Sequence, residues 1–204
     1  MKQTLKLGIT LAAFAAISCT ILAVVNNVTS PIIKKHALEK ANTALTKIFP
    51  TADSFVAVED ISAGGNNEID EYLENNVARL DSLHIAFQGD TVIGAVVQAN
   101  GPTYTHTKIM VGINKNLILT GITILETSDT PGYGLLAKEP AFYKQFSNKD
   151  VSSPLVLGQN FDGISGATIT SKGYENVINF SIFIGAQYLA NNYGGAKLSE
   201  YTKH

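Results

Sequence analysis

Residues 83–125 read LHIAFQGDTVIGAVVQANGPTYTHTKIMVGINKNLILTGITIL, and this stretch predicts the fold class. Leu83–Phe87 and Val92–Ala99 are runs rich in apolar and β-branched residues, which favours two strands. Between them stands Gln88-Gly89-Asp90, a short glycine-containing turn signal. Two strand-like runs joined by such a turn are typical of a β-hairpin.

The same pattern repeats further along the stretch. Lys108–Ile113 and Leu117–Leu125 are strand candidates around Asn114-Lys115-Asn116, and the isoleucines and threonines of the second run favour strand over helix. Hairpins that follow one another in the sequence place their strands antiparallel. The sequence therefore predicts an antiparallel sheet at the centre of the domain.

Helical patterns lie on both sides of these hairpins. Upstream, Ser30-Pro31 is typical of a helix start and Phe49-Pro50 of a helix end. Apolar residues recur between them at three- and four-residue steps: Ile33, Ala37, Leu38, Ala41, Leu45 and Ile48. Downstream, Glu139–Phe146 predicts a short helix and Ser171–Tyr193 a long one that Gly194-Gly195 ends. With a loop predicted over SAGGNN at 62–67, the whole reads as an α+β domain with flanking helices.

The N-terminal region contains an uncharged apolar run, Leu7–Val25. Its length is close to the roughly 20 residues that a membrane-spanning helix needs. A cleaved signal peptide is the alternative, but the apolar run is long for one and no convincing A-x-A site follows. Ala16-Ile17-Ser18-Cys19 resembles a lipoprotein cleavage box only weakly, because the usual leading leucine is absent. We predict a tail over 1–6, a transmembrane anchor over 7–28, an amphipathic connecting helix over 29–50 and the folded domain over 51–204.

The side of the membrane on which the domain lies is a separate question. Lys2 and Lys6 precede the apolar run, and Lys34, Lys35 and Lys40 follow it, so the positive charges nearly balance. We predict a cytoplasmic N-terminus and a main domain on the periplasmic or extracytoplasmic side, although charge alone does not decide the orientation. The chain is then a single-pass protein of the cytoplasmic (inner) membrane.

Composition excludes several kinds of site. The net charge is −2 and no basic run follows the apolar segment, so we predict no nucleic-acid partner. Cys19 is the single cysteine and the four histidines are scattered, so the sequence predicts no metal site. Any redox chemistry on this chain therefore requires an organic cofactor or a partner protein.

A polar stretch rich in small residues precedes the last predicted helix. Residues 162–171 read DGISGATITS, and the free N–H groups of a helix start favour a phosphoryl group. The plain alternative is a loop in which Thr170 or Ser171 caps the helix. A Walker A loop is excluded because Lys172 follows the hydroxyl cluster, and a G-x-S-x-G elbow lacks its final glycine. A serine hydrolase acting through Ser165 is a minor alternative.

The segment Asp162–Thr168, DGISGAT, resembles the flavinylation signature of a known family. That family contains the G subunit of the Rnf complex and the C subunit of the sodium-pumping NADH:quinone oxidoreductase. The resemblance implies that a flavin transferase uses FAD to attach FMN, through its phosphate, to Thr168. A further segment, Glu126–Gly134, is similar to the family's E-x-x-E-T-P-G-L-G stretch near the flavin, with Asp129 in place of glutamate and Tyr133 in place of leucine.

The resemblance also implies a role and a site. The role is that of an electron carrier in an Rnf-type ferredoxin:NAD⁺ oxidoreductase complex that moves Na⁺ or H⁺, with membrane and iron–sulfur subunits as partners and no complete active site on this chain alone. The alternative is a membrane-anchored accessory domain that holds a phosphate-bearing ligand without electron transfer of its own. The expected flavin-site residues are Thr168, Ser165, Gly166, Ala167, Thr170, Ser171, Thr130, Pro131, Gly132, Tyr133, Gly134 and Glu126. Aromatic or sulfur-containing side chains that could stack on the ring are Tyr104, Met110, Tyr133, Phe142, Tyr143, Phe161 and Tyr174, with Tyr133 preferred.

Overall fold

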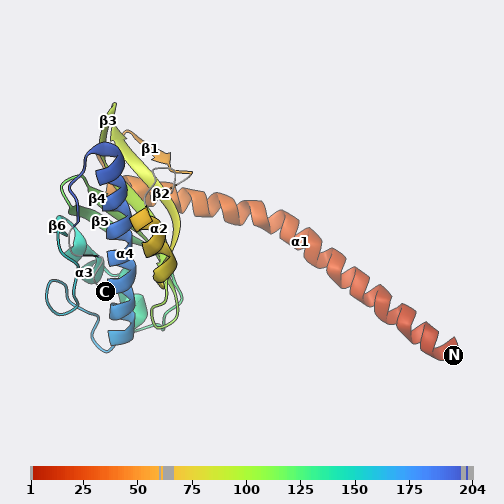
Figure 1. Ribbon diagram of the computed structural model, residues 1–204. Helices are drawn as coiled ribbons and strands as arrows, with labels where there is room; N and C mark the ends of the chain where they lie inside the picture. Colours follow the sequence, from red (N-terminus) through yellow and green to blue (C-terminus); the bar gives the residue numbers. More distant parts are fainter. Residues whose placement is uncertain (1, 60, 62–66, 199–200, 202–204) are drawn as a thin grey trace. The chain divides into compact units, whose positions relative to one another are not determined.

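The structure, a computed structural model, describes residues 2–59, 61, 67–198 and 201 (Figure 1). The chain divides into two compact units, residues 1–42 and 43–204, which we describe separately. The predicted loop over 62–67 lies outside the described residues except for Asn67, which begins a helix. The predicted α+β class with an antiparallel sheet is confirmed.

The second unit is built on a six-stranded antiparallel sheet in which each strand pairs with the next strand in the sequence. Both predicted hairpins are confirmed as the pairs β2–β3 and β4–β5. The glycine of the first turn, Gly89, has a φ of +56°, and Asn114 Oδ1 accepts bonds from the Asn116 and Ile118 N–H groups in the second. The strands are β1 (Ser54–Ala57), β2 (Arg79–Gln88), β3 (Thr91–Gly101), β4 (Thr107–Asn114), β5 (Ile118–Thr127) and β6 (Lys149–Asp150).

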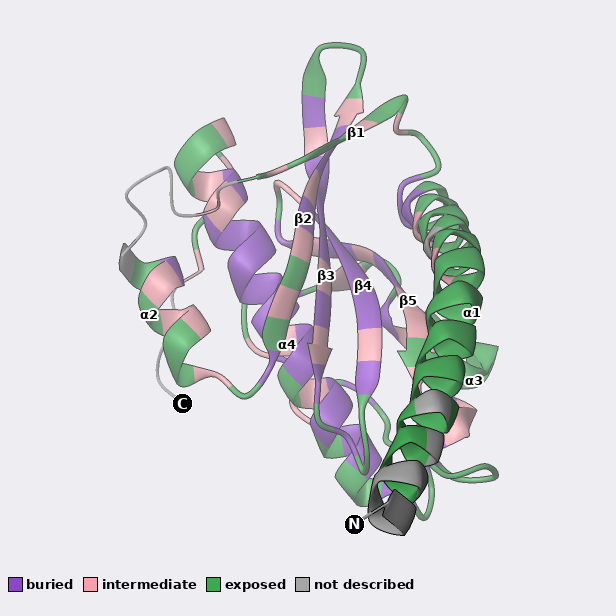
Figure 2. Cartoon of the chain, turned by 90° about the vertical axis from the view of Figure 1, so that its right-hand side faces the viewer, coloured by how far each residue is buried: buried purple, intermediate pink, exposed green. Residues whose placement is uncertain are grey.

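The long helix α4 (Thr168–Tyr193) covers one face of this sheet (Figure 2). Side chains alternate between the two faces of a strand, so the buried Val97 and Ile113 face α4 while their chain neighbours point the other way. Gly185 of α4 marks the closest approach, because a Cβ there would lie 3.1 Å from Val97 Cγ2 and 2.9 Å from Ile113 Cγ2. The helix α2 (Asn67–Asn75) packs on α4 through Tyr72, whose ring centroid is 4.0 Å from that of Phe183.

The opposite face is covered by the end of α1 (Lys2–Ile48). Ile48 and Phe49 are each 4% exposed and fill the space above two glycines of the sheet. A Cβ on Gly112 would lie 2.1 Å from Ile48 Cγ2, and one on Gly94 would lie 2.4 Å from Phe49 Cζ. The two glycines therefore create the groove into which this last turn packs.

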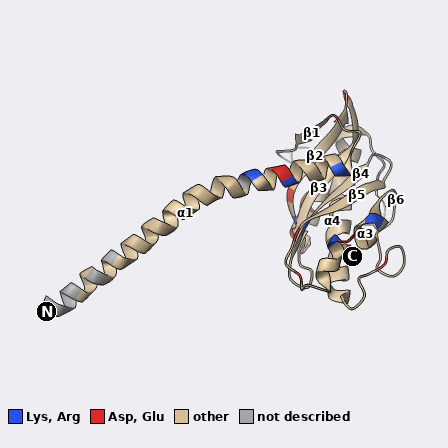
Figure 3. Cartoon of the chain, turned by 180° about the vertical axis from the view of Figure 1, so that it is seen from behind, with Lys and Arg blue, Asp and Glu red and all other residues tan. Residues whose placement is uncertain are grey.

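The helix α1 is continuous, so the predicted helix start at Ser30-Pro31 is wrong. Pro31 lies inside the helix, where its missing N–H leaves the Asn27 carbonyl without its usual bond, yet the turns on either side continue. The sequence has no Lys, Arg, Asp or Glu from Leu7 to Ile33, and among the described residues of α1 Figure 3 shows charged residues only toward the C-terminal end of the helix. Among the residues that the structure describes, α1 is the one helix long and apolar enough to cross a membrane, which agrees with a single-pass membrane protein.

The predicted short helix at 139–146 is broken into two pieces, and a separate 3₁₀ turn precedes them. The 3₁₀ turn η2 (Gly134–Lys138) is followed by α3 (Pro140–Tyr143) and a second 3₁₀ turn, η3 (Lys144–Phe146). Phe146 is fully buried and anchors this segment against the core. The pieces form a wall beside the start of α4, and that start is where the sequence places its chemistry.

Candidate functional site

The helix α4 begins at Thr168 rather than at Ser171. Its N-cap is Ala167, which has a φ of −130° and no side chain able to accept a bond from the first turn. The alternative in which Thr170 or Ser171 caps the helix is therefore wrong. An uncapped helix start leaves N–H groups free for an anion and presents the positive end of the helix dipole.

Ser171 instead braces the loop that precedes the helix. Its fully buried hydroxyl accepts a bond from the Ile164 N–H at 2.9 Å and donates to the Ala167 carbonyl at 3.0 Å. On the other side of the loop, Gln145 binds both backbone groups of Asp162, at 2.7 Å and 3.0 Å. The loop is thus fixed at both ends.

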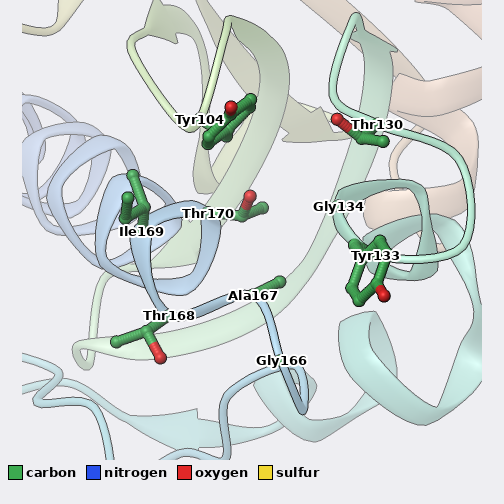
Figure 4. Close-up of a pocket in the computed structure, with 9 residues that line it drawn as sticks. All are labelled: Tyr104, Thr130, Tyr133, Gly134, Gly166, Ala167, Thr168, Ile169 and Thr170. Carbon is green, nitrogen blue, oxygen red and sulfur yellow. The ribbon is translucent and has the colours of Figure 1, made fainter.

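A cavity of about 430 Å³ opens beside the first turn of α4 (Figure 4). Tyr104 and Tyr133 lie on different sides of it, and they are 63% and 57% exposed. The Tyr133 ring lies against Gly166, where a Cβ would be 3.4 Å from the ring atoms; Gly166 also has a φ of +73°. The residues that line the cavity are Tyr104, Thr130, Tyr133, Gly134, Gly166, Ala167, Thr168, Ile169 and Thr170.

The structure brings both predicted segments to this cavity, but not every predicted residue. Thr168 is exposed at the rim, and Thr130, Tyr133, Gly134, Gly166, Ala167 and Thr170 also line the cavity.

The other predicted residues lie elsewhere. Glu126 is in β5 opposite Lys108, and Pro131 and Gly132 are exposed on the loop before η2. Ser165 lines a separate cavity of about 210 Å³, and Ser171 is buried beneath the loop. Sequence reasoning missed Ile169, which is 63% exposed at the rim.

The aromatic candidates divide in the same way. Tyr104 and Tyr133 are the two that line the cavity. Phe142, Phe161 and Tyr174 are buried in the core, and Met110 is also buried. Tyr143 is partly buried, and the Lys47 ammonium lies 4.8 Å from its ring centroid.

Asp129, which the sequence did not place in the site, holds the base of the cavity together. It is only 3% exposed, and its Oδ1 accepts bonds from the Thr103 hydroxyl at 2.7 Å, the Thr105 hydroxyl at 2.7 Å and the Thr105 N–H at 2.8 Å. Burial alone would raise the pKa of Asp129, but these bonds, with a nearby Thr170 hydroxyl, hold it below its usual value. The sequence signal that could have identified Asp129 is its position in the Glu126–Gly134 segment, where the family stretch has a glutamate.

Two glycines allow close backbone packing here, Gly134 against Asp129 and Gly173 of α4 against Thr103. A Cβ on Gly134 would lie 2.3 Å from Asp129 Cβ, and one on Gly173 of α4 would lie 2.5 Å from Thr103 Cα. Deeper still, the Thr107 hydroxyl donates to Tyr174 Oη at 3.0 Å. Burial, followed by a smaller contribution from the Asp129 charge, raises the pKa of Tyr174 against hydrogen bonds from threonine hydroxyls.

The positive potential at the rim comes mainly from the backbone N–H groups at the start of α4, because the nearby lysine is paired with a carboxylate. Lys172, one turn into α4, pairs with Glu175 at 3.2 Å, and Glu175 also accepts a bond from the Leu157 N–H at 2.9 Å. The cavity can therefore take a planar aromatic group between tyrosines, while the first turn of α4 takes an anion. This donor set fits FMN, and the exposed Thr168 hydroxyl lies among the residues that line the cavity.

Comparison with known proteins agrees with both parts of the chain. Residues 1–48 match the RnfG N-terminal region, and residues 104–182 match the FMN-binding domain. The G subunit of the Na⁺-translocating ferredoxin:NAD⁺ oxidoreductase complex of Acetobacterium woodii is 30% identical over 89% of this chain and 91% of its own length. The G subunit of the ion-translocating oxidoreductase complex of Methanosarcina acetivorans is 27% identical over 91% of this chain and 97% of its own. The crystal structure of Shewanella oneidensis NqrC is similar with a TM-score of 0.47, at 15% identity, over 71% of this chain and 83% of that one.

Proposed function

This chain belongs to the family of G subunits of ion-translocating oxidoreductase complexes, and from that membership we propose that it carries FMN covalently on Thr168 and passes electrons within such a complex. Family membership gives the coarser part: an FMN-binding domain and a role in an oxidoreductase complex of several subunits. The finer part, an ester between the flavin phosphate and one alcohol, is our proposal. It follows from the geometry at the start of α4.

One observation carries the proposal. Thr168 is an exposed alcohol, the first residue of an uncapped helix, on the rim of a cavity flanked by two tyrosines. An acceptor for a transferase has to be reachable by a second protein, and the small residues Gly166 and Ala167 leave that approach open. The phosphodiester formed keeps one negative charge, which the helix start would stabilise by about 0.3–1 kcal/mol.

The residues around the cavity have separate parts in this function. Tyr133 and Tyr104 would flank the flavin ring, and the first turn of α4 would hold its phosphate. Once bound, the flavin supplies the electron-transfer chemistry, and the chain supplies position and electrostatics. A covalent bond also prevents loss of the cofactor, an advantage outside the cytoplasm, where we propose that the main domain lies.

The partners follow from the same proposal. We propose that the complex is of the ferredoxin:NAD⁺ type that moves Na⁺ or H⁺, with membrane and iron–sulfur subunits around this one, and that a flavin transferase acts during maturation. The anchor would be residues 7–28 of α1 in the cytoplasmic membrane, followed by the connecting segment 29–50 and the FMN-binding domain 51–204.

The test is the intact mass of the chain after expression with a flavin transferase. We expect the wild type to gain the mass of FMN minus water and to keep flavin fluorescence on a denaturing gel, and Thr168→Val to do neither. Ser165→Ala is the matched control, because it removes another exposed hydroxyl from the same loop and should keep the flavin. A flavin retained in Thr168→Val would remove Thr168 from this role.

The same preparation separates the other functions. A wild-type chain that stays unmodified beside an active transferase would favour an accessory domain that binds its ligand non-covalently. Labelling of Ser165 by a fluorophosphonate would instead support a hydrolase.

A further inference from the structure

The two oxygens of the Asp129 carboxylate have very different surroundings. Oδ1 accepts all three hydrogen bonds, from the Thr103 and Thr105 hydroxyls and the Thr105 N–H. Oδ2 is buried and has no hydrogen-bond partner among the residues that the structure describes. A buried polar atom without a partner is costly and rare, and a redox role is one of the reasons for which such an atom is retained.

The unpartnered oxygen lies close to two residues that line the cavity. A Cβ on Gly134 would lie 2.7 Å from Oδ2, and the hydroxyl of Thr170 lies near enough to favour the ionised form. Gly134 and Thr170 both line the cavity. Oδ2 thus lies directly behind Gly134, on the side of that residue that a side chain would occupy, and not on the surface of the cavity.

No cation neutralises this carboxylate within the described part of the chain. The ion pairs there include His36–Glu39, Lys108–Asp81 and Lys172–Glu175, and none of these includes Asp129. Three hydrogen bonds to one oxygen keep the group charged without cancelling its charge. The cavity therefore has a fixed negative charge at its base.

We propose that the Asp129 carboxylate acts through its charge on the flavin held in this cavity, and that this charge lowers the reduction potential of the ring. This inference rests on the proposed function. It assigns a tuning role to a residue that does not itself line the cavity and that carries no covalent bond to the cofactor.

The direction of the effect follows from charge balance. An external reductant, dithionite in the test below, supplies two electrons, and the ring takes up one proton from solvent to give a singly negative reduced form. A fixed negative charge nearby disfavours this anion more than the neutral oxidised ring. Removal of the charge should raise the reduced-to-oxidised ratio at a given electrode potential by about tenfold, which is about 30 mV for a two-electron couple.

The experiment compares midpoint potentials of full-length, flavin-loaded protein in detergent. Asp129→Asn and the smaller Asp129→Ser remove the charge, and Asp129→Glu keeps it. Asp81→Asn is the control, since Asp81 also accepts side-chain hydrogen bonds, from Gln98 and Asn100, but its charge is paired with Lys108 and none of these three partners lines the cavity. Two neutral variants are made so that poor folding of one leaves the other to decide.

We expect a higher potential in both neutral variants, and a potential near that of the wild type in Asp129→Glu and Asp81→Asn. Equal potentials in the wild type and a folded neutral variant would overturn the inference alone, because the intact masses would still report the covalent flavin. An unmodified wild-type chain would overturn the proposed function and this inference together.

Discussion

Gly173 gives the sharpest test of the packing at the site, through the substitution Gly173→Ala. In an exposed helix this change would stabilise by about 0.5–1 kcal/mol. Here the added Cβ would lie 2.5 Å from Thr103 Cα and 2.6 Å from the Pro102 carbonyl oxygen. Both are backbone atoms, so the loop has to move away from α4.

The magnitude follows from what the loop carries. Overpacking of this kind costs about 1–3 kcal/mol. Displacement of Thr103 also breaks its 2.7 Å bond to the Asp129 carboxylate, and a hydrogen bond to a charged group contributes about 1.5–3 kcal/mol. After subtraction of the stabilisation that alanine gives to a helix, we expect Gly173→Ala to destabilise the domain by about 2–5 kcal/mol. We also expect it to displace Tyr104 at the cavity.

Tyrosine fluorescence during heating is a suitable assay, because the chain has no tryptophan and all its tyrosines lie at or beyond Tyr72. We expect the midpoint to fall by roughly 5–15 °C. Gly185→Ala is the comparison in the same helix: its Cβ would meet side-chain methyl groups of Ile113 and Val97 at 2.9 Å and 3.1 Å rather than backbone atoms, so we expect it to cost less than Gly173→Ala. Melting of Gly173→Ala at or above the wild-type temperature would refute the reasoning.

Three further predictions concern stability. Ser171→Ala leaves the buried Ile164 N–H without its 2.9 Å partner and should cost about 1–3 kcal/mol in urea unfolding; an unchanged midpoint would contradict the bracing role. Phe49→Ala empties the groove above Gly94 and should cost about 3–5 kcal/mol by the same measurement, unlike an exposed control such as Val56→Ala. Burial lowers the pKa of His84, whose Nδ1 has no partner among the described residues, so the unfolded chain binds a proton that the folded one does not. Stability should therefore fall as pH drops below about 6.5, and His84→Asn should flatten that part of the melting-temperature profile.

The parts of the fold that depend on local pattern were predictable. Hairpins β2–β3 and β4–β5 follow from strand-like runs around short turns, and the end of α4 follows from Gly194, whose φ is +67°. These features involve neighbours in the sequence. Their physical causes are therefore visible without the rest of the chain.

Other parts depend on contacts between distant segments. The strand β1 is four residues long and exists because Ser54–Ala57 pairs with the outer edge of β2. The start of α4 was predicted late because Thr170 and Ser171 have the chemistry of caps. In the folded chain the Ser171 hydroxyl instead accepts a hydrogen bond from the Ile164 N–H, and Ala167 occupies the cap position.

The site was predictable in its segments but not in its organisation. The motif around Thr168 and the segment around Tyr133 both reach the cavity. Nothing near Asp129 in the sequence shows that Thr103 and Thr105, more than twenty residues upstream, bury and bond it. The burial of that carboxylate is decided by the β3–β4 connection, which only the three-dimensional arrangement brings beside it.

The strand order also has a consequence for how the protein acquires its cofactor. Because every strand pairs with its predecessor, the sheet can form progressively by short-range closure, which is kinetically favourable. The proposed attachment point on α4 is different, since its surroundings combine Tyr104 and Thr130 with α4, the last described helix in the sequence. We expect a maturation enzyme to find its target only on chains that have finished folding, so modification would report successful folding.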